Sequence, residues 1–306
     1  MNSFRAAFLF SLCGSAVVFG APAEDASPAE SAVSELVAAR ERSALLDRLR
    51  DVIARRDAFF AEGETLSENE RSRRAADVAE RFEVLVTRFP DAVPALWLFA
   101  EFLRDGGELS RAEKLLLRAE QLEPDFVPAR FLLGEIFAAR GEPEKAFPRF
   151  DFSVRAAPEN LEYHLTFGEF LTDSREALLA EKIFSSRGEL DRAMQDEFRA
   201  ACAVAPSDLD VRVRYAESFY DAEAPDWNAA LAAWNAVSRL LDARDGDASV
   251  SSPLSAAVAL HRARASAELG RVEEAEKILS AAERVSALER SREAVSEIIE
   301  RQRKTK

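Results

Sequence analysis

Three prolines stand at equal intervals along the chain, because Pro90, Pro124 and Pro158 are 34 residues apart. The residues between them repeat one pattern of small and large apolar side chains. A fixed period in this range marks a stack of similar supersecondary units. The chain is therefore expected to fold as an array of repeats.

The two intervals align when each repeat is counted from the third residue after its proline, so that the repeats start at Val93 and Val127. In the first repeat the informative places hold Phe99, Ala100, Leu103, Gly107, Ala112, Leu116, Ala119 and Pro124. The second repeat has Leu133, Gly134, Phe137, Gly141, Ala146, Phe150, Ser153 and Pro158 at the same places. This agreement indicates two consecutive copies of one structural unit.

Each repeat has the pattern of a helical hairpin. Its apolar residues recur at spacings of three and four, which places them on one face of a helix. Gly107 and Gly141 interrupt this periodicity midway, where a turn between two helices needs them. The small residues let the paired helices approach closely. A single hairpin leaves one apolar face uncovered, so neighbouring hairpins must stack.

The pattern resembles the tetratricopeptide repeat, whose signature has small residues at places 8, 20 and 27, bulky ones at 7, 11 and 24, and proline at 32. The resemblance implies an all-α fold, a right-handed α-solenoid of stacked helix-turn-helix repeats over residues 33–306, and it is most specific in the centre. The repeats are expected at 45–90, 93–126, 127–160, 161–208, 209–252 and 254–285, with a C-terminal capping helix at 286–303.

Two irregularities interrupt the array. The repeat at 161–208 closes with Pro206, 48 residues after Pro158, so we place a 14-residue insert at 173–186. Because the insert contains apolar residues and neither proline nor glycine, we expect added helix rather than loop. Pro148 falls inside the second helix of its repeat, and the loss of a backbone hydrogen bond there predicts a bend near residues 144–148.

The first residues have the pattern of an export signal. Arg5 precedes an apolar stretch at 6–20, and small residues at 21 and 23 suit a signal peptidase. We expect a signal peptide at 1–23, cleaved after Ala23, followed by a flexible linker at 24–32. Removal of the signal would leave no stable membrane insertion, although an uncleaved N-terminal anchor is the alternative. The expected location is periplasmic or secreted.

Charge and cysteine content narrow the class of partner. The formal net charge is −14 at pH 7, and it becomes −15 without the leader, whose one charged side chain is Arg5. A strongly negative chain argues against nucleic acid or anionic lipid as partner. After cleavage Cys202 is the remaining cysteine, so no internal disulfide can form, and we expect it to be buried as a small hydrophobe.

No catalytic constellation stands out, and we expect no enzymatic activity, cofactor or metal. His164 and His261 lie in different repeats and are interpreted as ordinary surface or interface histidines. Asp242, Asp245 and Asp247 loosely resemble a calcium loop but lack its ligand order, so we interpret them as a solvated turn.

The resemblance also implies a ligand surface, because the first helix of each such repeat lines the concave side with places 2, 5, 9, 12 and 13. Place 9 holds Glu101, Glu135, Glu169 and Glu217, and place 5 holds Trp97, Phe131, Leu165 and Val213. Tyr220 and Asp221 extend this surface at places 12 and 13 of the fourth repeat.

A carboxylate row favours lysine or arginine in the partner, so we expect a protein or peptide segment with basic and apolar residues. In the alternative interpretation, the glutamates form a solvated face that serves solubility and the aromatic residues pack between helices.

The function expected from these features is a non-catalytic protein–protein interaction scaffold or adaptor, exported to the cell envelope. The alternative is a periplasmic chaperone or assembly factor for secreted or outer-membrane proteins, and a remote one is a cell-wall or carbohydrate-active enzyme. Repeat scaffolds place affinity in a few surface side chains that vary freely on one fold, so the identity of the partner depends on those side chains.

Overall fold

The computed structural model describes residues 28–62, 65–245, 253–282 and 284–305, and every regular element in these ranges is helical. The signal peptide expected at 1–23 lies outside the described residues. Helix α1 already begins at Pro28, so the end of the segment expected to be a flexible linker, 24–32, is helical from residue 28 onward.

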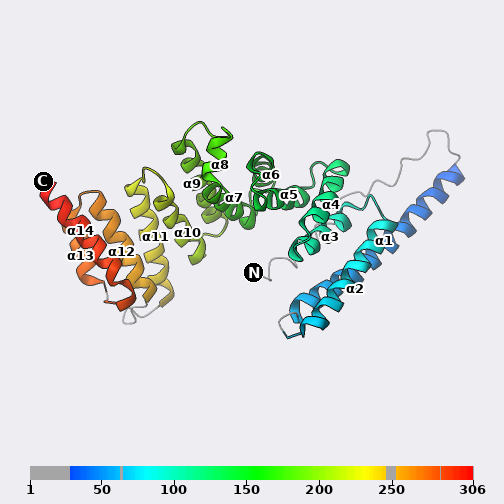
Figure 1. Ribbon diagram of the computed structural model, residues 1–306, viewed down its shortest axis with the longest axis horizontal. Helices are drawn as coiled ribbons and strands as arrows, with labels where there is room; N and C mark the ends of the chain where they lie inside the picture. The colour runs from blue at the N-terminus through cyan, green and yellow to red at the C-terminus, as the bar shows by residue number, and fades with distance from the viewer. Residues whose placement is uncertain (1–27, 63–64, 246–252, 283, 306) are drawn as a thin grey trace. The chain divides into compact units, whose positions relative to one another are not determined.

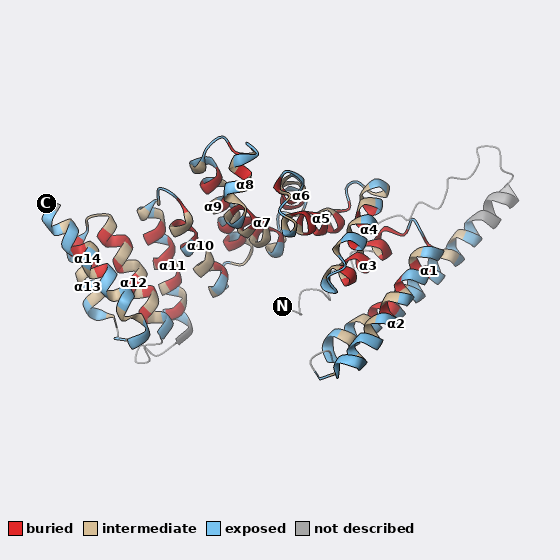
Figure 2. Cartoon of the chain, in the orientation of Figure 1, coloured by how far each residue is buried: buried red, intermediate tan, exposed pale blue. Residues whose placement is uncertain are grey.

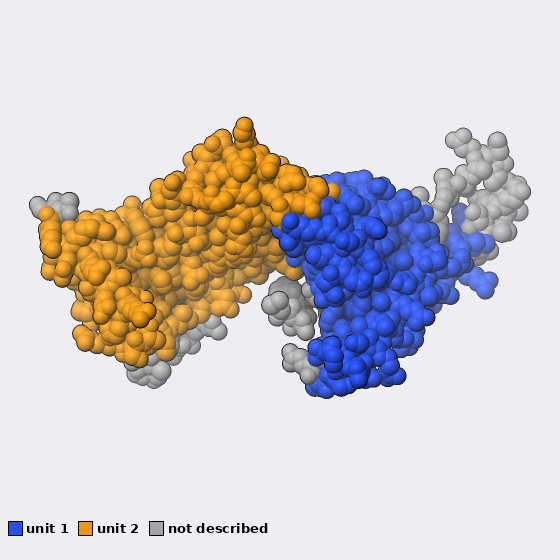
Figure 3. All heavy atoms as spheres, in the orientation of Figure 1, with its two compact units in different colours: residues 1–140 blue, residues 141–306 orange. Residues whose placement is uncertain are grey.

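The chain divides into two compact units, residues 1–140 (unit 1) and 141–306 (unit 2) (Figure 3). Unit 1 contains α1 (Pro28–Glu62), α2 (Glu68–Arg88), α3 (Val93–Asp105), α4 (Leu109–Leu122) and α5 (Val127–Ala139). Unit 2 contains α6 (Pro143–Ala156), α7 (Leu161–Asp173), α8 (Arg175–Ala180), α9 (Arg187–Val204), α10 (Leu209–Asp221), α11 (Trp227–Asp245), α12 (Pro253–Glu268), α13 (Val272–Ala281), η2 (Ser286–Leu288) and α14 (Glu289–Thr305). Figure 1 labels these helices in chain order.

Within each unit consecutive helices pair as antiparallel hairpins that pack on the next hairpin. In unit 1, α1 pairs with α2 and α3 with α4, and α4 also contacts α5. In unit 2 the pairs are α7 with α9, α10 with α11 and α12 with α13, and α14 covers the last pair. The expected all-α solenoid of stacked hairpins with a capping helix is therefore confirmed.

Glycines with a positive φ make the turns between paired helices. Gly107 follows α3 with φ 79° and Gly270 follows α12 with φ 72°. At the first turn Glu108 N–H donates to Leu103 O at 2.8 Å, and at the second Arg271 N–H donates to Ser266 O at 2.9 Å. The same closure occurs at both turns, and its left-handed residue favours glycine because it has no Cβ.

The repeated prolines follow the ends of second helices. The backbone N–H of the residue before each proline donates a hydrogen bond to the carbonyl of the residue four places earlier. The pairs are Phe89 to Leu85, Glu123 to Ala119, Ala157 to Ser153 and Ala205 to Ala201. Proline has no N–H and cannot continue the ladder, so the helix ends there and the chain turns to the next hairpin.

The small and bulky repeat positions form the core of each unit. In unit 1, Ala100, Ala112 and Ala119 have no exposed surface, and buried residues recur along each hairpin in Figure 2. In unit 2, Gly168 of α7 faces α9 so closely that a Cβ built on it would lie 2.8 Å from the Phe198 ring. The small places therefore set how near the paired helices come.

The insert at 173–186 differs from its prediction. Asp173 is the last residue of α7 and Arg175–Ala180 forms α8, whereas residues 181–186 form turns and bends in which Lys182 has φ 58°. Leu178 is fully buried, and the Phe184 ring meets Phe147 edge-on at 5.4 Å. The prediction of added helix is therefore wrong for residues 181–186, because the apolar side chains reach α6 only if the chain turns back.

An ion pair fixes the inserted helix on unit 2. Arg175 of α8 lies 3.2 Å from the buried Asp191 of α9, and the second oxygen of Asp191 accepts a hydrogen bond from Glu223 N at 3.0 Å. The insert is thereby tied to α9 and to the segment between α10 and α11.

Two further details concern individual residues. Helix α6 extends through Pro148, whose missing N–H leaves the Glu144 carbonyl without its usual helical partner, while the bend expected at 144–148 stays a prediction.

Helix α11 continues to Asp245, so the prediction of a solvated turn is wrong for Asp242 and Asp245. Asp247 lies outside the described residues.

The capping helix closes the apolar face of the last hairpin. Val295 and Ile299 of α14 are 3% and 4% exposed and pack on Ala263, Ala267 and Ala275. The opposite side of α14 carries charged residues, as a terminal helix that meets water requires.

Candidate partner-binding surfaces

In unit 1 the glutamates at place 9 are held by arginines from the preceding first helix. Arg56 Nη1 of α1 donates to Glu101 Oε2 at 2.9 Å, and Arg104 Nη1 of α3 donates to Glu135 Oε2 at 2.5 Å. With repeats counted from Leu45 and Val93, both arginines stand at place 12. The same two places therefore form an ion pair between successive first helices, with side chains 12–27% exposed.

In unit 2 the direction of the pair is reversed. Arg214, at place 6 of α10, forks the carboxylate of Glu169 on α7, with its Nε 2.5 Å from Oε1 and its Nη2 3.0 Å from Oε2. The guanidinium also lies 4.2 Å from the centre of the Phe198 ring and 3.1 Å from Asp221. Charge-assisted bidentate geometry of this kind fixes the register of the two helices.

Three of the four glutamates thus join neighbouring repeats, a role that the sequence interpretation did not include. Glu217 of α10 is exposed. A partner that approaches Glu101, Glu135 or Glu169 must compete with an arginine that is already bound.

The apolar side chains at place 5 mostly belong to the core. Phe131 is 5% exposed, Leu165 packs beside Ala201 and Val211, and Val213 packs on the cluster around Trp234. Trp97 is half-buried, with its ring edge-on to Phe126 at 5.9 Å. These contacts favour packing between helices for this row and leave Trp97 as a more accessible member in unit 1.

Tyr220 belongs to an aromatic cluster in unit 2. Its hydroxyl is hydrogen-bonded to His261 Nδ1 at 3.1 Å, and the His261 ring stacks on Trp234 at 4.2 Å. The Arg264 guanidinium lies 4.7 Å from the Tyr220 ring and 5.6 Å from the Trp227 ring. Burial raises the pKa of Tyr220 to about 12 and lowers the pKa of His261 to about 4, so both are neutral at pH 7.

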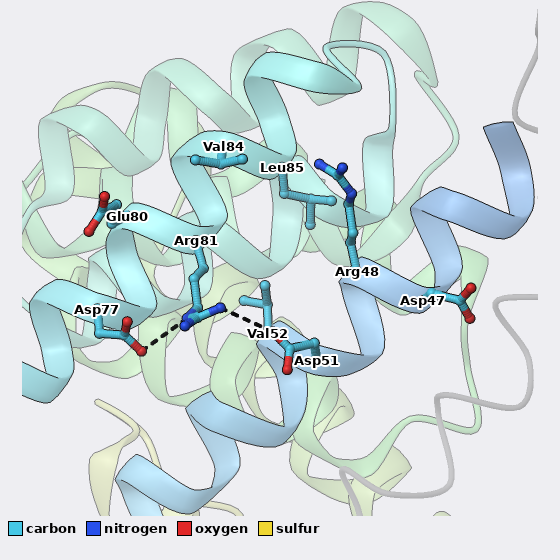
Figure 4. Close-up of a pocket in the computed structure, with 9 residues that line it drawn as sticks. All are labelled: Asp47, Arg48, Asp51, Val52, Asp77, Glu80, Arg81, Val84 and Leu85. Atoms are coloured by element: carbon cyan, nitrogen blue, oxygen red, sulfur yellow. Dashed lines mark hydrogen bonds and ion pairs between the residues drawn. The ribbon is translucent and has the colours of Figure 1, made fainter.

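A cleft of about 550 Å³ lies between α1 and α2 (Figure 4). Its walls combine four carboxylates with two arginines and three apolar side chains, namely Asp47, Asp51, Asp77, Glu80, Arg48, Arg81, Val52, Val84 and Leu85. The residues from α2 recur at spacings of three and four, so they form one stripe along the helix. This stripe is a sequence signal for the cleft that the repeat register did not use.

Arg81 bridges the floor of this cleft. Its Nε donates to Asp77 Oδ2 at 3.0 Å and its Nη1 to Asp51 Oδ2 at 3.3 Å, while Asp47 and Glu80 lie on either side of the bridge in Figure 4. The bond from Arg81 lowers the pKa of Asp77. Val84 at the rim is 54% exposed, so the cleft offers apolar surface beside carboxylates.

A second cleft, of about 530 Å³, lies in unit 2 between α12 and α14. It is lined by Ala257, Leu260, His261, Arg264, Leu288, Ser291, Ala294, Val295, Glu297, Ile298 and Arg301. It adjoins the aromatic cluster through His261 and Arg264.

The remaining candidate residues have structural surroundings. Both ring nitrogens of the buried His164 have acceptors, Glu197 Oε2 at 2.7 Å and Pro158 O at 3.0 Å, and the bond to Glu197 raises the pKa of His164. Cys202 is buried at 5% exposure, as predicted.

No group of three or more potential metal ligands occurs within the described ranges. Among the described helices, none combines the length and apolar character needed to cross a membrane.

No protein-family model matches the chain. A "TPR repeat-containing protein" of Treponema pallidum (strain Nichols) is 26% identical over 111 residues, which span 36% of this chain and 14% of that protein.

Two solved structures illustrate the likeness in fold. YrrB, described as a TPR protein with an unusual peptide-binding site, is 16% identical with a TM-score of 0.50 over 74% of this chain and 99% of its own. MamA from Desulfovibrio magneticus RS-1 is 13% identical with a TM-score of 0.44 over 65% of this chain and 97% of its own. At such identities the match with YrrB concerns the fold.

Proposed function

Because this chain folds as a solenoid of tetratricopeptide repeats, we propose that it is a non-catalytic scaffold that holds protein partners in the cell envelope. The bound segment carries basic and apolar side chains. The observation on which this proposal depends is the cleft between α1 and α2, which places carboxylates beside apolar side chains.

The charge of the cleft favours a cation. Asp51 and Asp77 share Arg81, and Glu80 forms no ion pair within the described residues. A lysine or arginine of the partner can lay its aliphatic stem on Val84 and extend its charged end toward Glu80. The net charge of −14 on the whole chain adds a long-range attraction for basic segments.

The first-helix face of each unit extends the same proposal beyond the cleft. In unit 1 its residues are Trp97, Glu101, Phe131 and Glu135, and in unit 2 they are Leu165, Glu169, Val213, Glu217 and Tyr220. Their surroundings make Trp97 in unit 1 and Glu217 in unit 2 the more accessible contacts. The peptide-binding site named for YrrB is a property of that protein and supports the general mode of binding here.

Binding of a defined peptide tests the cleft. The full chain without its leader is titrated with a fluorescent peptide of alternating lysine and leucine, and compared with the Asp47→Lys/Glu80→Lys variant. Each reversal of a partly solvated charge is worth about 0.5–1 kcal/mol, so the double variant should bind roughly five- to thirtyfold more weakly.

The matched control is Asp125→Lys/Glu159→Lys, because both side chains are exposed and the change in charge is the same. Its affinity should fall by less than about threefold, through long-range charge alone. An equal loss in both variants would reduce the effect to net charge and reject the cleft.

Export is tested by the mass of the protein recovered from its native cell. Residues 1–23 have the pattern of a signal peptide, so the envelope fraction should contain a chain that begins at Glu24. A chain that keeps Met1 and fractionates with membranes would favour the uncleaved anchor instead.

One observation favours the chaperone alternative. Of the five large apolar side chains that stand out as exposed among the described residues, four lie on α1 and α2: Val37, Leu46, Phe60 and Val84. A chaperone would use this surface for unfolded clients, and replacement of Leu46 and Val84 by serine should then lower its capacity to prevent client aggregation. A scaffold with a defined partner shows no such capacity.

A further inference from the structure

The charge of the first-helix face changes sign in the last repeat. When α12 is counted so that Ala263 stands at place 8, Arg264 stands at place 9, where the four preceding repeats have glutamate. Its neighbours at the same face, Leu260 and His261, line the cleft between α12 and α14. The position that carries a carboxylate elsewhere therefore carries a cation here.

Arg264 forms no ion pair with any carboxylate among the described residues, and its Nε is buried without a hydrogen-bond partner. The Tyr220 and Trp227 rings lie 4.7 and 5.6 Å from its guanidinium carbon. Aromatic faces attract and orient a guanidinium without neutralising its charge. The side chain is thus held in place with its positive charge available.

The other charged or titratable side chains that line the cleft do not neutralise the charge of Arg264. Burial keeps His261 neutral, with its pKa lowered to about 4. Arg301 of α14 lies 3.2 Å from Glu268, so its charge is partly balanced, and Glu297 is exposed on α14. Arg264 is therefore the principal cation facing the cleft, beside a wall formed by Leu260, Leu288, Val295 and Ile298.

We propose that the cleft between α12 and α14 docks a segment of a protein partner in which an acidic side chain lies next to a bulky apolar one. The carboxylate pairs with the guanidinium of Arg264, and the apolar side chain enters the volume of about 530 Å³. Arginine suits this role because its planar fork matches a carboxylate.

The net charge of −14 gives this docking its specificity. An acidic segment is repelled by most of the chain and attracted where Arg264 is unpaired, so the rest of the surface disfavours binding elsewhere. The inference rests on the scaffold function, and it adds a site in unit 2 whose preference is opposite to that of the α1–α2 cleft.

The probe is a synthetic peptide of about 12 residues, acetylated and amidated so that it has no terminal charge, with one glutamate beside leucine. Titration calorimetry with the full chain at low salt should show saturable binding. Replacement of that glutamate by glutamine should weaken binding by about tenfold or more, because a charge-assisted pair is lost.

Two variants of the chain report on the site independently. Arg264→Gln removes the cation, and Ala294→Trp places a large side chain on the α14 wall of the cleft and keeps the cation; each should lower the affinity about tenfold. The control is Arg239→Gln, an equal change of charge at an exposed residue of α11, which should leave affinity within about twofold. Circular dichroism of each variant checks that it is folded.

The outcomes separate this inference from the proposed function. Equal affinity for the glutamate and glutamine peptides overturns the proposed docking site. Loss of affinity in the Arg239→Gln control but not in the Arg264→Gln variant overturns it as well. Binding only by a peptide with a free C-terminus overturns it in favour of chain-end recognition. If the acidic peptide fails while the lysine–leucine peptide still binds the α1–α2 cleft, this inference alone is rejected; if both fail, the scaffold function falls with it.

Discussion

Gly168→Ala tests how closely α7 and α9 pack. A Cβ built on Gly168 lies 2.8 Å from both Cε1 and Cζ of Phe198, where real Cβ contacts do not occur. Phe198 is completely buried and its ring also lies beneath Arg214, at 4.2 Å, so it has little freedom to move. The added methyl group must therefore push the two helices apart or distort the ring.

The expected magnitude follows from two opposing terms. Overpacking of a well-packed core costs about 1–3 kcal/mol, and the upper part of that range, about 2–3 kcal/mol, applies to a ring with little freedom to move, whereas alanine in place of glycine favours a helix by about 1 kcal/mol. The net effect is a loss of about 1–2 kcal/mol in the free energy of unfolding. For a domain of the size of unit 2 this corresponds to a melting temperature lower by roughly 2–8 °C.

Urea unfolding followed by circular dichroism measures the change. The matched control is Gly188→Ala in the first turn of α9, where an added Cβ meets nothing within 4 Å, so this variant should be as stable as the parent or slightly more so. A second variant, Phe198→Leu, makes room for the methyl group, and the effect of Gly168→Ala should shrink in that background. Equal stability of the Gly168 variant and the parent would refute the close contact.

Three further predictions concern pH and backbone. The bond to Glu197 raises the pKa of His164, so the protonated His164 stabilises the fold fully below pH 6.5 and this stabilisation is lost as the pH rises through the raised pKa. The difference in free energy of unfolding between the parent and His164→Gln should therefore narrow from pH 6 to 8. His261 behaves oppositely, because burial lowers its pKa to about 4. The free energy of unfolding should fall by up to roughly 3 kcal/mol as the pH falls from 6.5 to 4. His261→Phe should abolish that loss when the melting temperature is measured across the same pH range. Gly107→Ala should cost about 1 kcal/mol because φ is 79°, whereas Gly106→Ala, at φ −82°, should cost less in the same urea assay.

Part of the candidate surface could be read from the sequence because the repeat register fixes which places face inward. The register correctly placed the core residues, among them Ala112 and Ala146, and it brought the place 9 glutamates onto the first helices. It could not show that Glu101 meets Arg56, 45 residues away, or that Glu169 meets Arg214 from the following repeat. Ion pairing depends on side-chain reach across helices, which no local spacing encodes.

The insert and the clefts needed the folded chain for the same reason. Local composition favoured helix throughout 173–186, but the packing of Phe184 against Phe147 required turns instead. The cleft beside Arg264 is formed where α14 packs on α12, and the signal for it in the sequence is one arginine at a place held elsewhere by glutamate.

The sequence by itself determined the stacked helical hairpins, their turns and their buried faces, since a repeated pattern of side-chain size and glycine acts through neighbours along the chain. The tertiary structure alone decided which glutamates of the first helices form ion pairs and that Arg264 forms none within the described residues. Helix packing sets the distances between charged groups on neighbouring helices, and the free energy of a charge depends on those distances and on the water around it.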